Sequence, residues 1–269
     1  MAEGYYFLHP EEWPYDALDM NLDPWQKETI HTLFTGKKRR MSVRAGHGCG
    51  KSMLAAVIAH IFLMNWIPSK IIVSGPTGRQ TRLQFWAYLN DMWNRSVFKN
   101  DLEWQKTKMF VRGEKNEENW FCAWVSSKNP KNMEGFHGPL EGRNLLWIIE
   151  EAKGVQDAAY EGLSGALSHE DNYLYISSTC GPPRGHFYKS HTTLRHIYDT
   201  KHVPSTISPR VSKDQIETWK LQYNGEDSPI FRARVMAEFP TGSDFAIAPL
   251  EWLEDAIDSR SRFEDSDAD

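Results

Sequence analysis

Short strand-like runs alternate with longer helical runs along the first two thirds of the chain. Residues 41–45 and 71–74 are short β-rich runs, while residues 145–149 and 173–177 are apolar enough for strands buried on both faces. Residues 51–66 form a longer apolar run, and residues 78–94 repeat large apolar side chains at four-residue spacing, as helices do. This alternation predicts an α/β fold with a mostly parallel sheet and helices on both faces.

Two further patterns complete the expected fold. Residues 108–112 and 120–126 are typical of an antiparallel pair of strands joined by a polar turn. After Pro204 the pattern becomes helical: Ser212 opens a helix that ends near Gly225, and Ser228 opens a second helix that reaches about Phe239. We therefore expect a small helical subdomain at the C-terminal side of the sheet.

The bulk composition is that of a folded protein with one large core. The chain has 269 residues, of which 40% are hydrophobic and 25% charged, which is far from the composition of disordered chains. The net charge of −5 excludes binding to nucleic acid by overall charge alone, so any DNA contact must be local. The basic run at residues 37–40, with Arg79, Arg82 and Arg184, offers one such patch, although such a run is more often a solvated turn.

The cysteines and the N-terminal sequence indicate in which cellular compartment the protein is expected to function. Cys49, Cys122 and Cys180 are odd in number and widely spaced, which favours a reducing, intracellular setting without structural zinc. The first residues are acidic and aromatic, unlike a signal peptide, and no apolar run approaches the ~20 residues of a membrane span.

Residues 45–52 carry the strongest chemical signal. They read Ala-Gly-His-Gly-Cys-Gly-Lys-Ser, directly after a predicted strand and at the start of a predicted helix. In such a loop, backbone N–H groups converge on phosphate oxygens, the lysine neutralises the β- and γ-phosphates, and the serine ligates magnesium. Ala45 replaces the usual first glycine. The expected nucleotide ligands are Gly46, His47, Gly48, Cys49, Gly50, Lys51 and Ser52.

Two carboxylates end the apolar strand at residues 145–149. Glu150, where aspartate is commoner, is expected to join Ser52 in holding magnesium, and Glu151 is expected to polarise the attacking water. Acidic residues often end strands, so this pair gains its meaning from the phosphate loop that precedes it.

Two weaker signals flank these motifs. The hydroxyl-rich turn that includes Thr179 follows the next strand, where it would sense a γ-phosphate; it could equally be an ordinary turn. Upstream, the segment Asp23-Pro24-Trp25-Gln26 would let Gln26 hydrogen-bond adenine beside Trp25. Alternatively, Trp25 belongs to the core and Gln26 to the surface.

Together, the stretches VRAGHGCGKS, LLWIIEEAKGV, SSTCGPPRGHFY and DSPIFRARVMAEFP resemble the ATPase region of phage terminase large subunits over roughly residues 20–255. The resemblance implies a P-loop NTPase core of the ASCE (RecA-like) type that uses ATP and Mg²⁺ to move double-stranded DNA into a procapsid. It implies a ring, expected to be a pentamer, on the portal protein in the host cytoplasm, with the small terminase subunit as a further partner and no membrane. It also implies an arginine that reaches a neighbour's ATP. Arg143 is the first candidate and Arg44 and Arg184 are alternatives; each could equally be a surface ion-pair partner.

On this interpretation the chain divides into an N-terminal arm on the adenine side (residues 1–40), the ATPase core (41–205), a lid (206–250) and an acidic tail or linker (251–269). Complete large terminases usually continue into a nuclease with fixed aspartates. Asp265 and Asp267 lie in the acidic tail and do not replace that cluster, so we expect no nuclease activity.

Three other classes use related motifs. A helicase would need a second RecA-like half, for which the residues after Pro204 are too few. A small-molecule kinase has less need for a second strand-end acid, because its nucleophile is the substrate hydroxyl. A nucleotide-dependent interaction module would bind ATP and hydrolyse it poorly.

Overall fold

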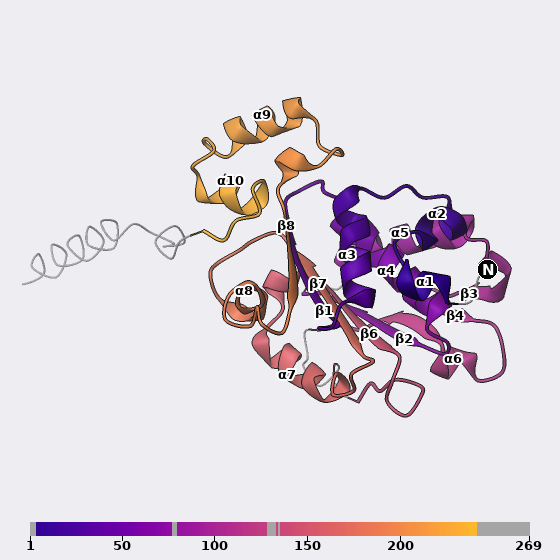
Figure 1. Cartoon of the computed structure of the whole chain (residues 1–269). Helices are drawn as coiled ribbons and strands as arrows, with labels where there is room; N and C mark the ends of the chain where they lie inside the picture. Colours follow the sequence, from indigo (N-terminus) through magenta and orange to yellow (C-terminus); the bar gives the residue numbers. More distant parts are fainter. Residues whose placement is uncertain (1–3, 77–79, 128–132, 134, 241–269) are drawn as a thin grey trace, which may run out of the picture.

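The computed structural model describes residues 4–76, 80–127, 133 and 135–240, which fold around an eight-stranded sheet (Figure 1). The strand order is β3-β4-β5-β2-β6-β7-β1-β8. The strands are β1 (Arg40–Ala45), β2 (Lys70–Ser74), β3 (Leu102–Trp104), β4 (Lys108–Val111), β5 (Phe121–Trp124), β6 (Leu145–Glu150), β7 (Tyr173–Ser178) and β8 (Asp199–Val203).

Six neighbouring strands, from β5 to β8 in the sheet order, pair in parallel, whereas β4 is antiparallel to both of its neighbours. The mostly parallel sheet and the antiparallel pair β4–β5 that the sequence predicts are therefore confirmed. β3 and β8, at the two edges, were not predicted. β8 has one fully buried side chain, Val203, so it lacks the apolar run that identifies a central strand.

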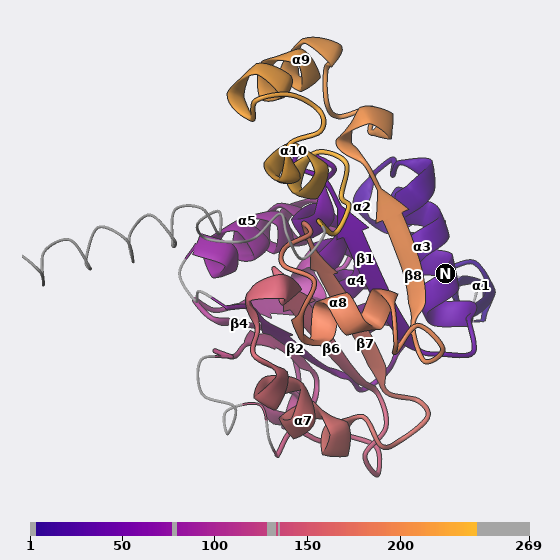
Figure 2. The same ribbon diagram turned by 90° about the vertical axis from the view of Figure 1, so that its left-hand side faces the viewer.

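Helices cover both faces of the sheet, as predicted (Figure 2). One face carries α1 (Tyr5–Leu8), α2 (Trp13–Leu18), α3 (Pro24–Thr35), α4 (Lys51–Asn65) and α5 (Gln80–Arg95). The other face carries α7 (Asp157–Ala166) and α8 (Gly185–His191), while the short α6 (Asn116–Asn119) lies between β4 and β5. No helix of the described residues has the length and apolar character needed to cross a membrane.

Each face of the sheet has its own apolar core. α4 lies within the first core with residues 53–63 buried, which explains why its sequence is apolar all round. Trp13 and Ile30 bring the N-terminal helices into the same core. On the opposite face, Trp147 of β6 packs with Leu163 of α7. The three cysteines are free thiols and buried.

A small helical unit lies beyond the carboxyl ends of β1 and β8 (Figures 1 and 2). It contains α9 (Lys213–Gln222) and α10 (Pro229–Arg234), which share a cluster built on Ile216, Phe231 and Val235. The hydroxyls of Ser212 and Ser228 cap the two helices, as the sequence predicts. We refer to residues 204–240 as the lid.

The second lid helix is shorter than predicted. It ends at Arg234 rather than near Phe239, because the carbonyls of Arg234 and Val235 accept hydrogen bonds from His47 and Ser205 instead of continuing the helix. The rest of the expected lid (241–250) and the acidic tail (251–269) lie outside the described residues.

Candidate functional site

The loop between β1 and α4 has the backbone that a phosphate ligand requires. Gly48 and Gly50 adopt φ of 74° and 85°, in the left-handed region that glycine enters without strain. Lys51 Nζ donates hydrogen bonds to the carbonyls of Ala45 (3.2 Å) and Gly46 (3.0 Å), so the ammonium lies over the loop. These residues form the loop that the sequence predicts, and Lys51 is held at its centre.

The first half of this loop is joined to the lid. A side chain at Gly46 would place its Cβ 2.2 Å from Ser205 Oγ and 2.5 Å from the carbonyl oxygen of Val235, so only glycine fits. His47 N–H donates to the carbonyl of Arg234 (2.8 Å), and the Ser205 hydroxyl donates to the carbonyl of His47 (2.8 Å). A change in the loop must therefore affect the lid.

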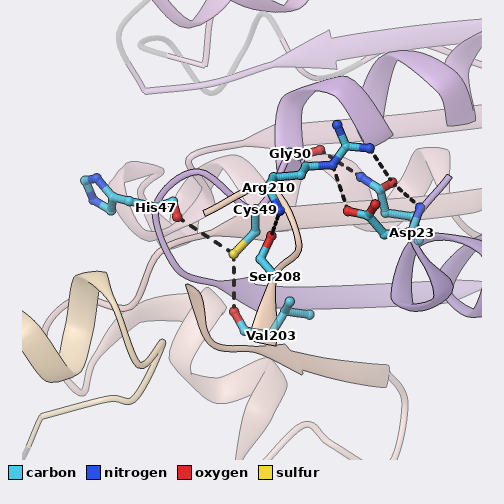
Figure 3. A network of polar contacts seen from close by, with 8 residues as sticks. Asp23, His47, Cys49, Gly50, Val203, Ser208 and Arg210 are labelled. Atoms are coloured by element: carbon cyan, nitrogen blue, oxygen red, sulfur yellow. Dashed lines mark hydrogen bonds and ion pairs between the residues drawn. The ribbon is translucent and has the colours of Figure 1, made fainter. Parts of the chain in front are cut away.

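Cys49 points into the interior rather than toward the cavity beside the loop. Its thiol is fully buried near the carbonyls of His47 (3.8 Å) and Val203 (3.7 Å), and burial raises its pKa (Figure 3). The side chain of Cys49 therefore packs the loop against β8, and only its backbone remains available to a nucleotide.

Glu150 joins the phosphate loop to the end of β6. Its carboxylate is 2% exposed and accepts hydrogen bonds from the hydroxyls of Ser52 (2.5 Å) and Ser177 (2.9 Å). Burial raises the pKa of Glu150, while the two serine donors oppose that shift. Ser52 and Glu150, predicted as a magnesium pair, are thus in direct contact.

Glu151 lies on the wall of the same cavity as Lys51. Its backbone is left-handed, with φ of 49°, which is uncommon for a residue with a side chain and turns the chain sharply after β6. The Ser178 hydroxyl donates to the Glu151 carboxylate (3.3 Å) and so helps to orient it. Glu151 therefore lines the same cavity as Lys51, with its carboxylate oriented by the end of β7.

The turn after β7 also reaches the cavity. Thr179 is 4% exposed, and its hydroxyl accepts a hydrogen bond from Lys153 Nζ (2.5 Å), which also approaches the carbonyl of Cys180 (3.4 Å). Lys153 follows the acid pair, yet the sequence reasoning assigned it no role. Its position two residues after Glu151 was the available signal.

The N-terminal segment contacts the loop from the other side. Gln26 is fully buried and donates to the carbonyl of Gly50 (3.4 Å), while Asp23 and Gln26 form a capping box that starts α3. Arg210 of the lid forms an ion pair with Asp23 (2.7 Å) across this segment (Figure 3). Trp25 is 8% exposed in the first core and does not line the cavity, so the structure places it with the core rather than beside a base. Gln26, in contrast, is not on the surface.

The cavity between these elements has a volume of about 900 Å³. It brings together most of the predicted residues with several that the sequence reasoning missed. The predicted lining residues are His47, Gly48, Gly50, Lys51, Ser52, Glu151 and Thr179, and the additional ones are Met53, Gln84, Tyr88, Lys153, Arg210 and Arg234. Arg210 and Arg234 come from the lid and reach the cavity only after the chain folds back, which explains why no local pattern identified them.

Positive charge dominates the cavity. Burial, followed by the nearby charges of Lys51, Arg234 and Lys153, lowers the pKa of His47 to about 4, so this histidine is neutral at pH 7. Within the described part of the chain, Arg210 has a carboxylate partner, whereas Lys51, Lys153 and Arg234 form no ion pair. Three such cations around one cavity favour a polyanionic ligand such as a polyphosphate.

The donor set suits magnesium bound together with phosphates. Ser52 and Glu150 offer hard oxygen ligands in contact with each other, which Mg²⁺ prefers. In the described residues there is no cluster of three or more His, Cys, Asp or Glu side chains that would hold a metal alone. Mg²⁺ is commonly held by one or two protein oxygens plus phosphates and water, so the residues present fit it.

The three arginine candidates lie outside this cavity. Arg143 precedes β6, at the opposite end of the strand from Glu150, and within the described residues it forms an ion pair with Glu141 at 3.9 Å. Arg44 lies over the Phe239 ring, and Arg184 occupies the N-cap position of α8. A role of these arginines toward a neighbour's ATP stays a prediction.

The basic run at residues 37–40 has structural contacts. Lys38 Nζ donates to the carbonyl of Tyr198 (2.7 Å), and Arg39 donates to the carbonyl of Phe34 (2.9 Å) and lies over the Tyr173 ring. Lys38 and Arg39 thus have structural roles, while Lys37 is exposed. Arg79 lies outside the described residues.

Comparison with known proteins confirms the resemblance to terminases. The chain is 29% identical over 241 residues to a protein of Enterobacteria phage P7 described as a probable terminase, large subunit; the match covers 85% of this chain and 48% of that protein. The chain thus spans about half the length of the curated relative it matches. No family model matches it.

Solved terminase structures share the fold. The large terminase ATPase domain of Thermus phage P74-26 superposes with a TM-score of 0.66 at 17% identity, covering 84% of this chain and 97% of that domain. The large terminase of bacteriophage HK97 gives a TM-score of 0.61 at 16% identity, covering 82% of this chain and 51% of that one. A large terminase of a thermophilic bacteriophage, solved in complex with ADP, gives a TM-score of 0.63 at 9% identity, covering 81% of this chain and 54% of that one. At these identities the likeness establishes the fold alone, an α/β fold shared with the ATPase domains of large terminases.

Proposed function

We propose that this chain is the ATPase motor of viral genome packaging, which hydrolyses ATP to move double-stranded DNA into a procapsid. The observation that carries the proposal is the contact between Ser52 of the phosphate loop and Glu150 at the end of β6, with Glu151 and Lys51 on one cavity. The likeness to the phage P7 protein and to terminase ATPase domains supports the same function.

Different residues would bind the phosphates and the base of the nucleotide. Lys51 would exchange the carbonyls of Ala45 and Gly46 for the β- and γ-phosphates, and backbone N–H groups of the loop would donate to the same oxygens. Bound magnesium supplies positive charge to the phosphate oxygens, and Ser52 and Glu150 would hold it. Gln26, Asp23 and Arg210 flank the loop on the side where a base would lie.

Hydrolysis requires a proton acceptor beside the terminal phosphate. We assign this role to Glu151, and the proposal is supported by its place on the cavity wall and by its hydrogen bond from Ser178. Glu151 takes the proton as the water attacks. A neighbouring subunit in a ring would add an arginine; Arg143 is the first candidate, with Arg44 and Arg184 as alternatives.

The wider setting follows from the terminase resemblance. We infer a ring of subunits, expected to be a pentamer, on the portal protein of a procapsid in the host cytoplasm, with the small terminase subunit as a partner. An interaction module that binds ATP with little turnover is the main alternative.

Turnover of ATP with and without double-stranded DNA tests the proposal. Lys51→Ala is expected to lose nucleotide binding, whereas Glu151→Gln is expected to bind ATP but hydrolyse it at least about 100-fold more slowly, the usual contribution of a general base. Glu161→Gln, an exposed acid on α7, is the matched control and should behave as wild type. Equal turnover by Glu151→Gln and wild type would reject the assignment of the base. Turnover near zero in wild type, whether or not DNA is present, would favour the interaction module.

A further inference from the structure

Lys153 shares an unusual combination of features with Lys51. Both ammonium groups reach the same cavity, and both bind neutral oxygens: Lys51 the carbonyls of Ala45 and Gly46, and Lys153 the hydroxyl of Thr179 and the carbonyl of Cys180. Neither forms an ion pair within the described residues. A lysine that served only to fix a turn would gain more from a carboxylate than from a threonine hydroxyl.

The backbone holds Lys153 rigidly at this position. The left-handed turn at Glu151 leads into a 3-10 turn, η3 (Ala152–Gly154), which packs so closely on Pro76 that a side chain at Gly154 would lie 2.9 Å from it. The stem of Lys153 passes along Gly181, where a Cβ would come within 3.1 Å of Lys153 Cδ. Because the stem is fixed, the ammonium remains at the cavity.

Its position is on the same side as the proposed base. Lys153 lies two residues after Glu151 and is bonded to Thr179, whereas Lys51 lies at the loop. Burial, opposed by the charge of Glu151 and reinforced by those of Arg234 and Lys51, lowers the pKa of Lys153, whose ammonium bonds to neutral oxygens in the described part of the chain. The phosphate nearest to this corner would be the terminal one.

Building on the proposed ATPase function, we propose that Lys153 is a second phosphate-binding lysine that contacts the terminal phosphate of bound ATP and reports its presence to β7 through Thr179. In the ligand-free protein the ammonium bonds to Thr179. With ATP bound, Lys153 donates to a terminal-phosphate oxygen instead, because a charge-assisted bond is stronger than one to a neutral hydroxyl. Thr179 is then released, and the turn after β7 gains a second arrangement that depends on the phosphate.

Binding of ADP and of the slowly hydrolysed analogue ATPγS to purified Lys153→Met separates this role from a structural one. The variant keeps the length of the side chain and loses its charge. We expect the affinity for ADP to change by no more than about twofold and that for ATPγS to fall at least about tenfold, the loss expected for one charge-assisted contact. Lys153→Arg should recover part of the loss. Equal losses for both nucleotides, or no loss for either, would overturn the proposal.

Amine labelling of the wild-type chain gives a second, independent readout. With peptide-resolved detection, ATPγS and ADP should both protect Lys51, whereas ATPγS alone should protect Lys153. Protection of Lys153 by both nucleotides, or by neither, would contradict the inference. If wild type binds neither nucleotide, the ATPase proposal itself fails; if wild type binds and hydrolyses ATP while Lys153 shows no preference, the failure is confined to Lys153.

Discussion

Replacing Glu150 by glutamine should stabilise the ligand-free protein although it removes a group the proposed activity needs. Glu150 is 2% exposed, and its two hydrogen-bond partners are the neutral hydroxyls of Ser52 and Ser177. Glutamine has the same shape, and serine hydroxyls both donate and accept, so both contacts survive without the buried charge.

The magnitude follows from two opposing terms. Burying a carboxylate costs several kcal/mol in a real protein, whereas hydrogen bonds to a charged group are each about 1–1.5 kcal/mol stronger than neutral ones. With two such bonds, the net gain for Glu150→Gln is about 1–2 kcal/mol, or a rise in Tm of about 2–8 °C. Glu150→Ala is the control: it also removes the charge but leaves both hydroxyls without their acceptor, so it should not stabilise.

The pH dependence of this effect has a definite sign. Burial raises the folded-state pKa of Glu150 above its usual value of 4.5, so the unfolded chain ionises first as pH rises and wild type loses stability between 4.5 and the raised pKa. The advantage of Glu150→Gln should therefore be full at pH 8 and vanish toward pH 4.5. Thermal unfolding of both variants without nucleotide measures it. A variant that melts below wild type at pH 8 would refute this account of the buried charge.

Three further predictions concern the surroundings of the site. Gly46→Ala should lower the free energy of unfolding by about 1–3 kcal/mol, because the Cβ of the new alanine would meet Ser205 and the backbone of the lid. An unchanged midpoint of chemical unfolding would show that the lid does not pack on Gly46. Asp23→Asn keeps the helix cap and loses the ion pair with Arg210, so it should lower the free energy of unfolding by less than about 1 kcal/mol. Asp23→Ala also loses the cap and should lower it by about 1 kcal/mol more. Equal losses of stability in the two variants would contradict the capping role. Burial lowers the pKa of His60 from 6.5 to about 4, so the unfolded chain binds the proton first as pH falls. The free energy of unfolding of wild type should therefore decrease by about 3 kcal/mol between pH 6.5 and pH 4, and that of His60→Leu should not. Parallel pH–stability curves for the two proteins would refute this prediction.

Local sequence identified the parts of the fold that carry their own pattern. β6 and β7 are buried at every position, and α4 is apolar on all sides, so each stands out in the sequence. β8 could not be predicted from its sequence, because it is held by parallel pairing with β1, more than 150 residues earlier in the chain, and not by an apolar pattern of its own side chains. Parallel pairing of this kind leaves little local signal.

The residues of the candidate site also fall into those that the sequence could predict and those that it could not. Lys51, Ser52, Glu150 and Glu151 belong to two short motifs, and the parallel sheet brings the motifs to one edge, so their proximity could be predicted. The lid cations could not, because no spacing rule links α10 to the phosphate loop. The segment that begins at Asp23 was interpreted through adenine, although Asp, Pro and Gln at these positions are also typical of a helix cap, and the structure contains that cap.

Several polar groups of the site bond to neutral partners, which form weaker hydrogen bonds with charged groups than an oppositely charged partner does. Lys51 and Lys153 bind neutral oxygens, Glu150 accepts hydrogen bonds from two serine hydroxyls, and the N–H of His47 donates to the lid carbonyl of Arg234. On the proposed function, a nucleotide that takes over one of these contacts must break an existing one, and the existing contacts lie within the phosphate loop, at the end of β7 and at the lid. On that proposal, the energy of nucleotide binding would be coupled to movement of these elements, as a motor requires.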